Sequence, residues 1–236
     1  IEQHAGDAAV FTEKAGVNCM VIDSVEDLRP VTGNLAFSLC LYSGQMCTTP
    51  QNILVPRDGI ETADGHLSFD EVATAIVKGV DWMLSDPARA SEVLGAIQSQ
   101  DTADRVDATD GTVLRAGGSV DHEHFPDART RGPRILQVDA ADLDTYGQEM
   151  FGPVVYVVAT DSSDHSIELA ASMARSQGAI SFGIYSTSDE VLTAAQDTMT
   201  AAGVPVSCNL LGSIWVNQSA AFSDFHVSGC NPSGNA

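Results

Sequence analysis

Basic and aromatic residues are scarce in this sequence of 236 residues. Lys and Arg number 11 against 32 Asp and Glu, which gives a formal net charge of −21, and aromatic residues make up only 6%. Such a charge repels phosphate backbones and anionic lipid headgroups, which excludes nucleic acid and the membrane surface as non-specific partners. Long apolar runs are also missing, because the longest candidate, Val154 to Ala159, is strand-sized, whereas a membrane helix needs roughly 18 residues.

Paired cysteines and nucleotide-binding glycine motifs are absent as well. The five cysteines are odd in number and form no C-x-x-C pair, which argues against a disulfide framework or zinc ribbon and favours a reducing, cytoplasmic location. No G-x-G-x-x-G occurs. The segment from Asp121 to His124 lacks the further ligands of a metal site, so no metal is expected. Because the chain starts at Ile1 without a signal peptide pattern, we expect it to be a piece of a longer chain.

Short β-branched runs alternate with stretches of helical periodicity. Strands separated by such helices need crossover connections, so we expect an α/β fold with a mostly parallel twisted sheet and helices on both faces. Ser68, three residues before Glu71, and Ser188 are expected to cap helices. The acidic, Gly-rich segment 101–133 is expected to be a surface excursion with one short strand at 112–114. The predicted strands are 18–22, 52–55, 134–138, 154–159, 179–185 and 213–216, and the predicted helices are 28–42, 69–84, 87–98, 163–176 and 189–202.

One cysteine lies in a segment that suits a nucleophile. In LYSGQMCTTPQNILVP, from Leu41 to Pro56, Cys47 stands between an expected helix end and a Thr-Thr-Pro turn that leads into a strand. A cysteine in such a loop can be exposed and backed by backbone N–H groups, which favours the thiolate and can bind an oxyanion. The alternative is that Cys47 is a small buried residue without reactivity.

Two carboxylates also stand next to predicted strands. In QEMFGPV, Glu149 and Phe151 lie on the same side of an extended segment, which suits holding a polar ring substituent and packing on the ring itself. In TEKAGVN, Glu13 precedes an Ala-Gly turn and a buried strand, which delivers a carboxylate to a sheet edge. Taken singly, a surface Glu beside a core Phe and a solvent-exposed Glu13 are the simpler explanations.

Taken together, the three segments resemble the aldehyde dehydrogenase family. Glu13 and Cys47 are 34 positions apart, and Cys47 and Glu149 are 102 apart. In that family a Glu, a Cys in a G-Q-x-C segment and an E-x-F-G-P-V segment follow one another at such distances. Val17 and Asn52 depart from the pattern, because the family usually has Lys at the first position and often a basic residue at the second. The resemblance continues through 111–119, 134–138, 179–187 and 212–217.

This resemblance implies an NAD(P)-dependent aldehyde dehydrogenase. It makes Cys47 the nucleophile that attacks the aldehyde and Glu13 the base that activates water to hydrolyse the thioester. Glu149 and Phe151 are then the contacts to NAD or NADP, through its ribose and its nicotinamide ring. The presence of Glu13 favours an acid product over transfer to coenzyme A. The string 34–52 further resembles the PaaN-like branch of phenylacetic acid degradation, which implies a semialdehyde substrate, with or without a linked coenzyme A.

The resemblance also implies that residues 1–236 form a catalytic domain alone. In the family a Rossmann-like cofactor domain precedes the position of Glu13, and a strand that joins subunits follows the GSIWVN segment. We therefore expect a longer, homo-oligomeric protein, and a chain that is inactive as a dehydrogenase by itself. Two other classes stay open: a cofactor-independent cysteine hydrolase or thioesterase that uses Cys47, and a non-catalytic interaction fragment.

Overall fold

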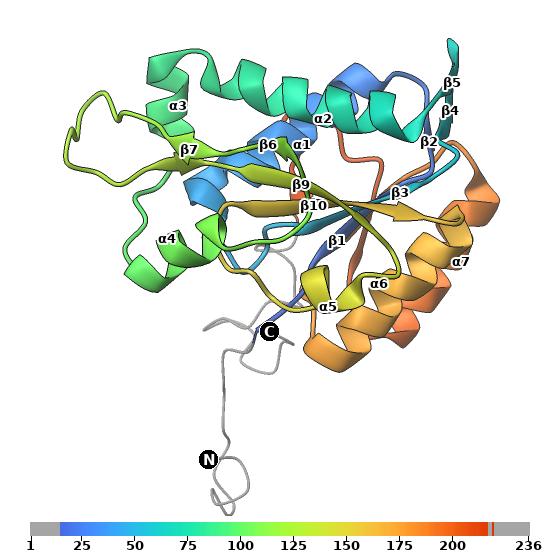
Figure 1. Cartoon of the computed structure of the whole chain (residues 1–236). Helices are drawn as coiled ribbons and strands as arrows, with labels where there is room; N and C mark the ends of the chain where they lie inside the picture. The colour runs from blue at the N-terminus through green and yellow to red at the C-terminus, as the bar shows by residue number, and fades with distance from the viewer. Residues whose placement is uncertain (1–14, 217–218, 220–236) are drawn as a thin grey trace, which may run out of the picture.

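A twisted sheet runs through the middle of the molecule (Figure 1). The computed structural model describes residues 15–216 and residue 219. Within these residues the main sheet has seven strands, of which six are parallel and one edge strand is antiparallel to its neighbour. This confirms the predicted mostly parallel α/β sheet. The order is β12 (Val206–Cys208), β11 (Phe182–Tyr185), β1 (Cys19–Ile22), β3 (Asn52–Pro56), β10 (Val154–Thr160), β9 (Arg134–Asp139) and the antiparallel β6 (Thr112–Arg115).

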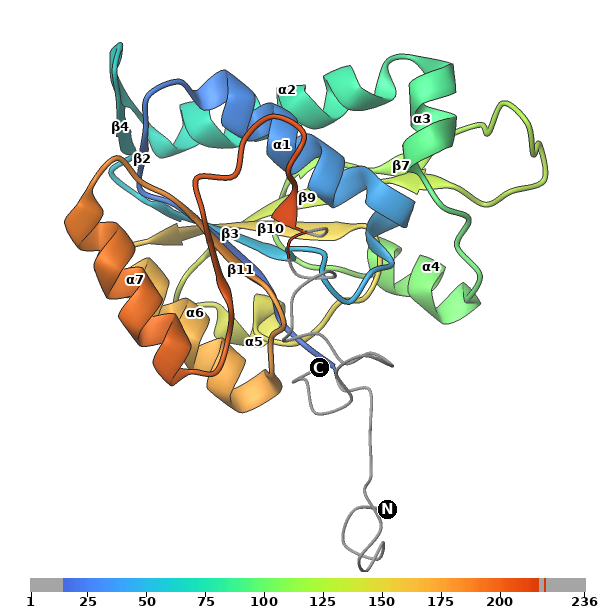
Figure 2. The same cartoon turned by 180° about the vertical axis from the view of Figure 1, so that it is seen from behind.

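Helices cover both faces of the sheet, as predicted (Figures 1 and 2). One face carries α1 (Leu28–Cys40) and α2 (Phe69–Leu84), and the other carries α6 (Ser163–Gln177) and α7 (Asp189–Ala201). Successive residues of a strand point to opposite faces, so the residues of β1 alternate between two hydrophobic cores. Burial of the central strands on both faces explains their near-continuous apolar sequences.

The predicted helix caps are present. The Ser68 hydroxyl accepts from the Glu71 backbone N–H, and the Glu71 carboxylate accepts from the Ser68 N–H at 2.9 Å, so α2 begins with a complete capping box. Ser188 caps α7 by accepting from the Val191 N–H at 3.4 Å. Because these bonds satisfy donors that have no partner inside the helix, they fix where each helix begins.

The prediction of a surface excursion over 101–133 is wrong in part. A helix, α4 (Gln100–Asp107), occupies its start, and Thr102 and Val106 of this helix are buried. With only these two buried side chains among acidic neighbours, the apolar period is too short to recognise in the sequence. The expected strand at 112–114 is present as β6, and a further strand pair joins β7 (Gly118–Ser119) to β8 (Arg131–Gly132).

The predicted strand at 213–216 is also wrong. The edge of the sheet is formed by β12 instead, and the Trp215 ring stacks on Phe37 of α1 with 4.0 Å between ring centroids. The apolar residues of this segment therefore pack on a helix rather than pair with a strand. Two predicted helices are shorter than expected: α1 ends at Cys40, and α3 (Pro87–Val93) ends five residues before the predicted boundary at Gln98.

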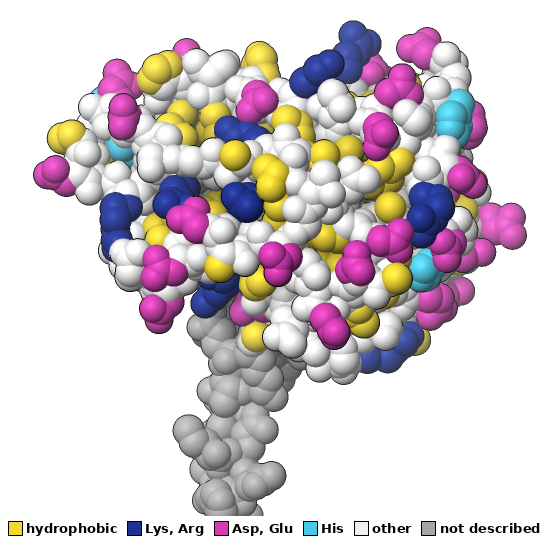
Figure 3. Space-filling view, viewed as in Figure 1, with side chains coloured by type: hydrophobic (Ala, Val, Ile, Leu, Met, Phe, Trp, Pro, Cys, Tyr) yellow, Lys and Arg dark blue, Asp and Glu magenta, His cyan; other side chains and the backbone are white. Residues whose placement is uncertain are grey.

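On the face seen in Figure 3, acidic side chains are scattered over several elements rather than gathered in one patch. No helix in the described part of the chain is long and apolar enough to cross a membrane.

The remaining elements lie at the edges of the molecule. They are the short 3₁₀ helix η2 (Leu41–Gly44), the sheet of β2 (Ser24–Val25), β4 (Ile60–Thr62) and β5 (Gly65–Leu67), and the single-turn helix α5 (Leu143–Tyr146).

Candidate active site

The segments that contain the predicted site residues meet at one end of the sheet, where the parallel strands begin. They directly precede β1, β3 and β10, so they lie at the amino ends of three neighbouring parallel strands. A small hollow of about 20 Å³ is lined by residues from all three, among them Gly16, Cys47, Glu149 and Phe151. The structure thus brings three of the four predicted site residues together. Glu13 lies outside the described residues.

Cys47 lies in a tight turn tied to the sheet by a buried amide. The turn is closed by the Thr49 N–H, which donates to the Met46 carbonyl at 3.0 Å, and the Cys47 side chain is partly exposed. Asn18 Nδ2 donates to the carbonyls of Cys47 at 2.6 Å and Thr49 at 3.2 Å. Its Oδ1 accepts two backbone N–H groups from the segment before β11, each at 3.0 Å. Since Asn18 is only 3% exposed, this buried side chain joins the Cys47 turn to the segments that lead into β1 and β11.

The backbone before Cys47 takes an unusual path. Tyr42, Ser43 and Gly44 have φ angles of 51°, 56° and 67°, three consecutive residues in the left-handed region. This run stops the helical path of α1 before residue 42, and the buried Ser43 hydroxyl holds it by donating to the Gly95 carbonyl at 2.8 Å. A Cβ on Gly44 would lie 2.4 Å from the Gly152 carbonyl oxygen. The cysteine loop therefore packs directly on the Gly-Pro turn that follows Phe151.

Glu149 faces the segment that follows Glu13. Its Oε1 accepts from the Gly16 backbone N–H at 3.2 Å, and the described residues make no other hydrogen bond to this carboxylate. Phe151 is 38% exposed, so it is not a core residue. Its carbonyl accepts from Arg105 Nη1 at 3.1 Å, which anchors the segment to α4.

The cysteines differ in chemical environment. Burial raises the pKa of Cys19 to about 12, with a smaller opposing effect from the Asn52 side chain, and burial likewise raises the pKa of Cys40 to about 12. Both therefore stay protonated thiols near neutral pH. Cys47, in contrast, lines the hollow with a partly exposed side chain.

The sequence did not identify the two side-chain amides, of Asn18 and Gln51, that hold the loops together at the amino ends of the strands. Asn18 and Gln51 are 3% and 6% exposed, and their side chains bond to backbone groups of segments far away in the chain. The two departures from the family pattern have structural roles of their own: Val17 is buried in a core cluster, and Asn52 Nδ2 donates to the Tyr146 carbonyl at 3.2 Å. A polar residue at the start of an apolar strand was the available signal.

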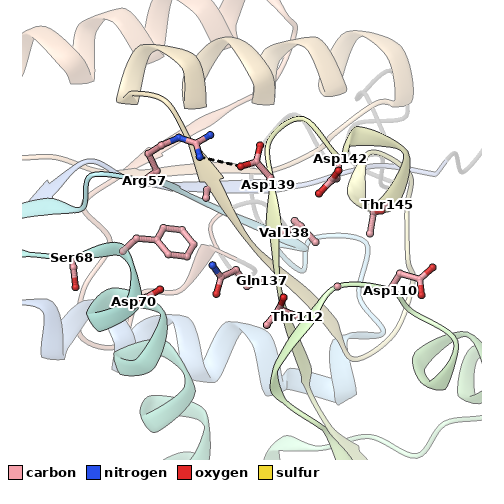
Figure 4. Close-up of a pocket in the computed structure, with 13 residues that line it drawn as sticks. Arg57, Ser68, Asp70, Asp110, Thr112, Gln137, Val138, Asp139, Asp142 and Thr145 are labelled. Carbon is pink, nitrogen blue, oxygen red and sulfur yellow. Dashed lines mark hydrogen bonds and ion pairs between the residues drawn. The ribbon is translucent and has the colours of Figure 1, made fainter.

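A larger hollow, of about 660 Å³, opens at the opposite end of the sheet (Figure 4). It lies at the carboxyl ends of β3, β9 and β10, where open α/β sheets commonly bind ligands. Cys47, Glu149 and Phe151 do not line it. Among the described residues that do, the one basic residue is Arg57, which is paired with Asp139 at 3.0 Å and with Asp161 at 2.9 Å.

Comparison with known proteins agrees with this geometry. The Aldehyde dehydrogenase family matches residues 1–235. An NAD-dependent aldehyde dehydrogenase from Burkholderia multivorans is 54% identical, with a TM-score of 0.91 over 98% of this chain and 42% of its own. N-succinylglutamate 5-semialdehyde dehydrogenase from Burkholderia pseudomallei (strain 1106a) is 31% identical over 165 residues, which is 67% of this chain and 32% of the relative. The structure of a Mycobacterium tuberculosis aldehyde dehydrogenase complexed with NAD+ shares the fold at 19% identity, with a TM-score of 0.60. The chain thus spans less than half the length of these relatives.

Proposed function

We propose that this chain, which belongs to the aldehyde dehydrogenase family, is the catalytic part of a longer enzyme that oxidises an aldehyde to the acid with NAD or NADP. The observation that supports this most directly is that Cys47 and Glu149 line one hollow, with Gly16 bonded to Glu149 only three residues after Glu13. The three segments that the family resemblance selects are thus neighbours in space although they are far apart in the chain. A cysteine hydrolase or an interaction fragment gives no reason for Glu149 and Phe151 to stand beside Cys47.

The residues at the hollow fit a nicotinamide cofactor. The Glu149 carboxylate has one oxygen on Gly16, and its second oxygen makes no hydrogen bond within the described residues, so it can accept from ribose hydroxyls. Phe151 offers a partly exposed aromatic ring for packing on a nicotinamide ring. Held by these two residues, a bound nicotinamide would supply the hydride acceptor for the oxidation of the aldehyde.

The chain's own residues account for the remaining steps. The Cys47 thiolate forms a bond to the aldehyde carbonyl carbon and gives a thiohemiacetal, whose oxidation leaves a thioester on the sulfur. Glu13 then takes a proton from water, the resulting hydroxide attacks the thioester carbonyl, and the carbon–sulfur bond breaks to release the acid and the Cys47 thiolate. Glu13 then releases the proton to solvent, so the net reaction converts aldehyde, water and NAD(P)+ to acid, NAD(P)H and a proton.

The substrate is the finer part of the proposal. The string 34–52 resembles the phenylacetic acid degradation branch, which favours a semialdehyde formed after ring cleavage. One relative is named for another semialdehyde, N-succinylglutamate 5-semialdehyde. We therefore place semialdehydes, with and without a linked coenzyme A, first among the candidate substrates, and propose that the enzyme works as a homo-oligomer.

Turnover of the full-length protein tests the function. We expect NAD(P)H formation with at least one aldehyde of a semialdehyde panel, and loss of that activity in Cys47→Ala. Cys208→Ala is the matched control, because Cys208 is also partly exposed but lies outside the hollow. The 236-residue chain alone should form no NAD(P)H. Ester hydrolysis by a full-length protein that oxidises no aldehyde would instead indicate a cysteine hydrolase.

A further inference from the structure

We infer that Gln51 is a positioning residue that sets the place of Glu149 relative to Cys47. The inference rests on the proposed function, in which Glu149 contacts the cofactor and Cys47 the aldehyde. Gln51 follows Cys47 by four positions and precedes Glu149 by 98. It directly precedes β3, between the two loops, and is 6% exposed.

The three shortest hydrogen bonds of the Gln51 side chain all join it to the segment that contains Glu149. Its Nε2 donates to the carbonyls of Tyr146 and Gln148, both at 3.0 Å. Its Oε1 accepts from the Met150 backbone N–H at 2.6 Å. One amide thus bonds to three backbone groups on both sides of Glu149, from the last residue of α5 into the irregular stretch that leads to β10.

The backbone of Gln51 is fixed to the sheet and the cysteine side of the site. Its N–H donates to the Asn18 carbonyl at 3.0 Å, and its carbonyl accepts from the Tyr156 N–H at 2.9 Å. Asn18 in turn bonds to the Cys47 carbonyl. These bonds do not involve the Gln51 side chain, so a side-chain substitution leaves the anchoring of Cys47 intact while it releases the segment that carries Glu149.

Gln51 thus holds the Glu149 segment by its side chain and is itself held to the cysteine side of the site by its backbone. Without the amide, the Gln148 carbonyl and the Met150 N–H lose their partner and the buried Tyr146 carbonyl keeps only Asn52 Nδ2, so the 146–150 segment has to move to reach water or new partners. A carboxylate displaced by about 1 Å no longer holds a ribose in the reactive geometry, and such misplacement lowers the rate even when the chemical groups are unchanged. Cys47 keeps its own turn and its own buried amide.

Kinetics of the full-length enzyme separate these effects. In Gln51→Leu we expect the KM for NAD(P) to rise about tenfold, since hydrogen bonds to buried groups are left unmade. The alkylation rate of Cys47 by iodoacetamide should stay within about twofold of the unsubstituted enzyme, because the Asn18 contact persists. Gln137→Leu is the matched control, because Gln137 lies on β9, which β10 separates from β3, and its side chain makes no hydrogen bond within the described residues.

The outcomes distinguish the inference from the function it rests on. An active enzyme in which Gln51→Leu leaves the cofactor KM unchanged contradicts the positioning role. So does an equal loss of Cys47 alkylation and cofactor affinity, which indicates general loosening of the fold. If Gln51→Leu does not fold, Gln51→Asn, which keeps an amide but is one methylene shorter, should show the same split. An unsubstituted enzyme without NAD(P)-dependent turnover overturns the proposed function instead.

Discussion

The side-chain amide of Asn18 donates to the backbone carbonyl of Cys47 across 2.6 Å. Because Asn18 precedes β1 and Cys47 precedes β3, this bond joins the amino ends of two adjacent parallel strands. It places the candidate nucleophile by its backbone and leaves the thiol in the hollow for chemistry. A residue with no atom in the reaction therefore controls where the sulfur stands.

Replacing this amide should cost both stability and activity. In Asn18→Ala, two N–H donors and two carbonyls lose their partner, so we expect the free energy of unfolding to fall by about 1–3 kcal/mol. We also expect kcat to fall, because the Cys47 turn is released. Asn34→Ala is the matched control: Asn34 is 2% exposed and bonds to the Ile214 carbonyl, away from the site. It should lose comparable stability and keep kcat; equal loss of kcat in both variants would remove Asn18 from the site.

Gly44 and Gly212 share a φ angle of 67° but differ in their surroundings. Alanine at either position pays the left-handed penalty of roughly 1–2 kcal/mol. At Gly44 alone the new Cβ would also meet the Gly152 carbonyl at 2.4 Å, whereas nothing lies within 4 Å at Gly212. Gly44→Ala should therefore lower the thermal midpoint more than Gly212→Ala and alone lower cofactor affinity. Equal shifts in the two variants would mean that the contact between the cysteine loop and Gly152 is not needed.

The sequence predicted the sheet, and the meeting of three candidate site residues in one hollow, better than the bonds that hold their segments together. Runs such as Val154 to Ala159 carry a local β signal, so the parallel sheet could be inferred from pattern and connection length alone. The expectation that Cys47 and Glu149 belong to one site came from the family resemblance and not from periodicity. The partners of Asn18 and Gln51 could not be predicted, because those side chains bond to backbone groups, which every residue offers alike.

The errors have the same physical origin. The apolar neighbours of Trp215 predict a strand, yet the choice between pairing with a strand and stacking on Phe37 depends on tertiary packing. The end of α1 depended on a left-handed run that begins at Tyr42, a residue with no local preference for that conformation.

Buried thiols predict a loss of stability at high pH. Burial raises the pKa of Cys19 in the fold to about 12, from a usual value of 9.0. Between these values the unfolded chain releases a proton that the folded chain keeps, so the unfolding midpoint should fall as pH rises from about 9. Cys19→Ala should weaken this dependence, and Cys208→Ala, at a partly exposed site, should not. A pH dependence unchanged by Cys19→Ala would contradict the assignment.

The two carboxylates of the proposed mechanism predict separable kinetics in the full-length enzyme. Glu13→Gln should leave the initial burst of NAD(P)H intact while steady turnover falls, because only the water-activating step loses its base, and general bases typically contribute about 10²–10⁴-fold. Glu149→Gln should slow the burst itself, since the cofactor is misplaced before the aldehyde is oxidised. Stopped-flow absorbance at the NAD(P)H band resolves the two phases. Glu61→Gln is the control, because Glu61 lies on β4, the middle strand of the small three-stranded sheet, and its one ion pair within the described residues is with His66 at 2.9 Å. A Glu13 variant that loses burst and steady turnover alike would place Glu13 before thioester formation and exclude it as the deacylation base.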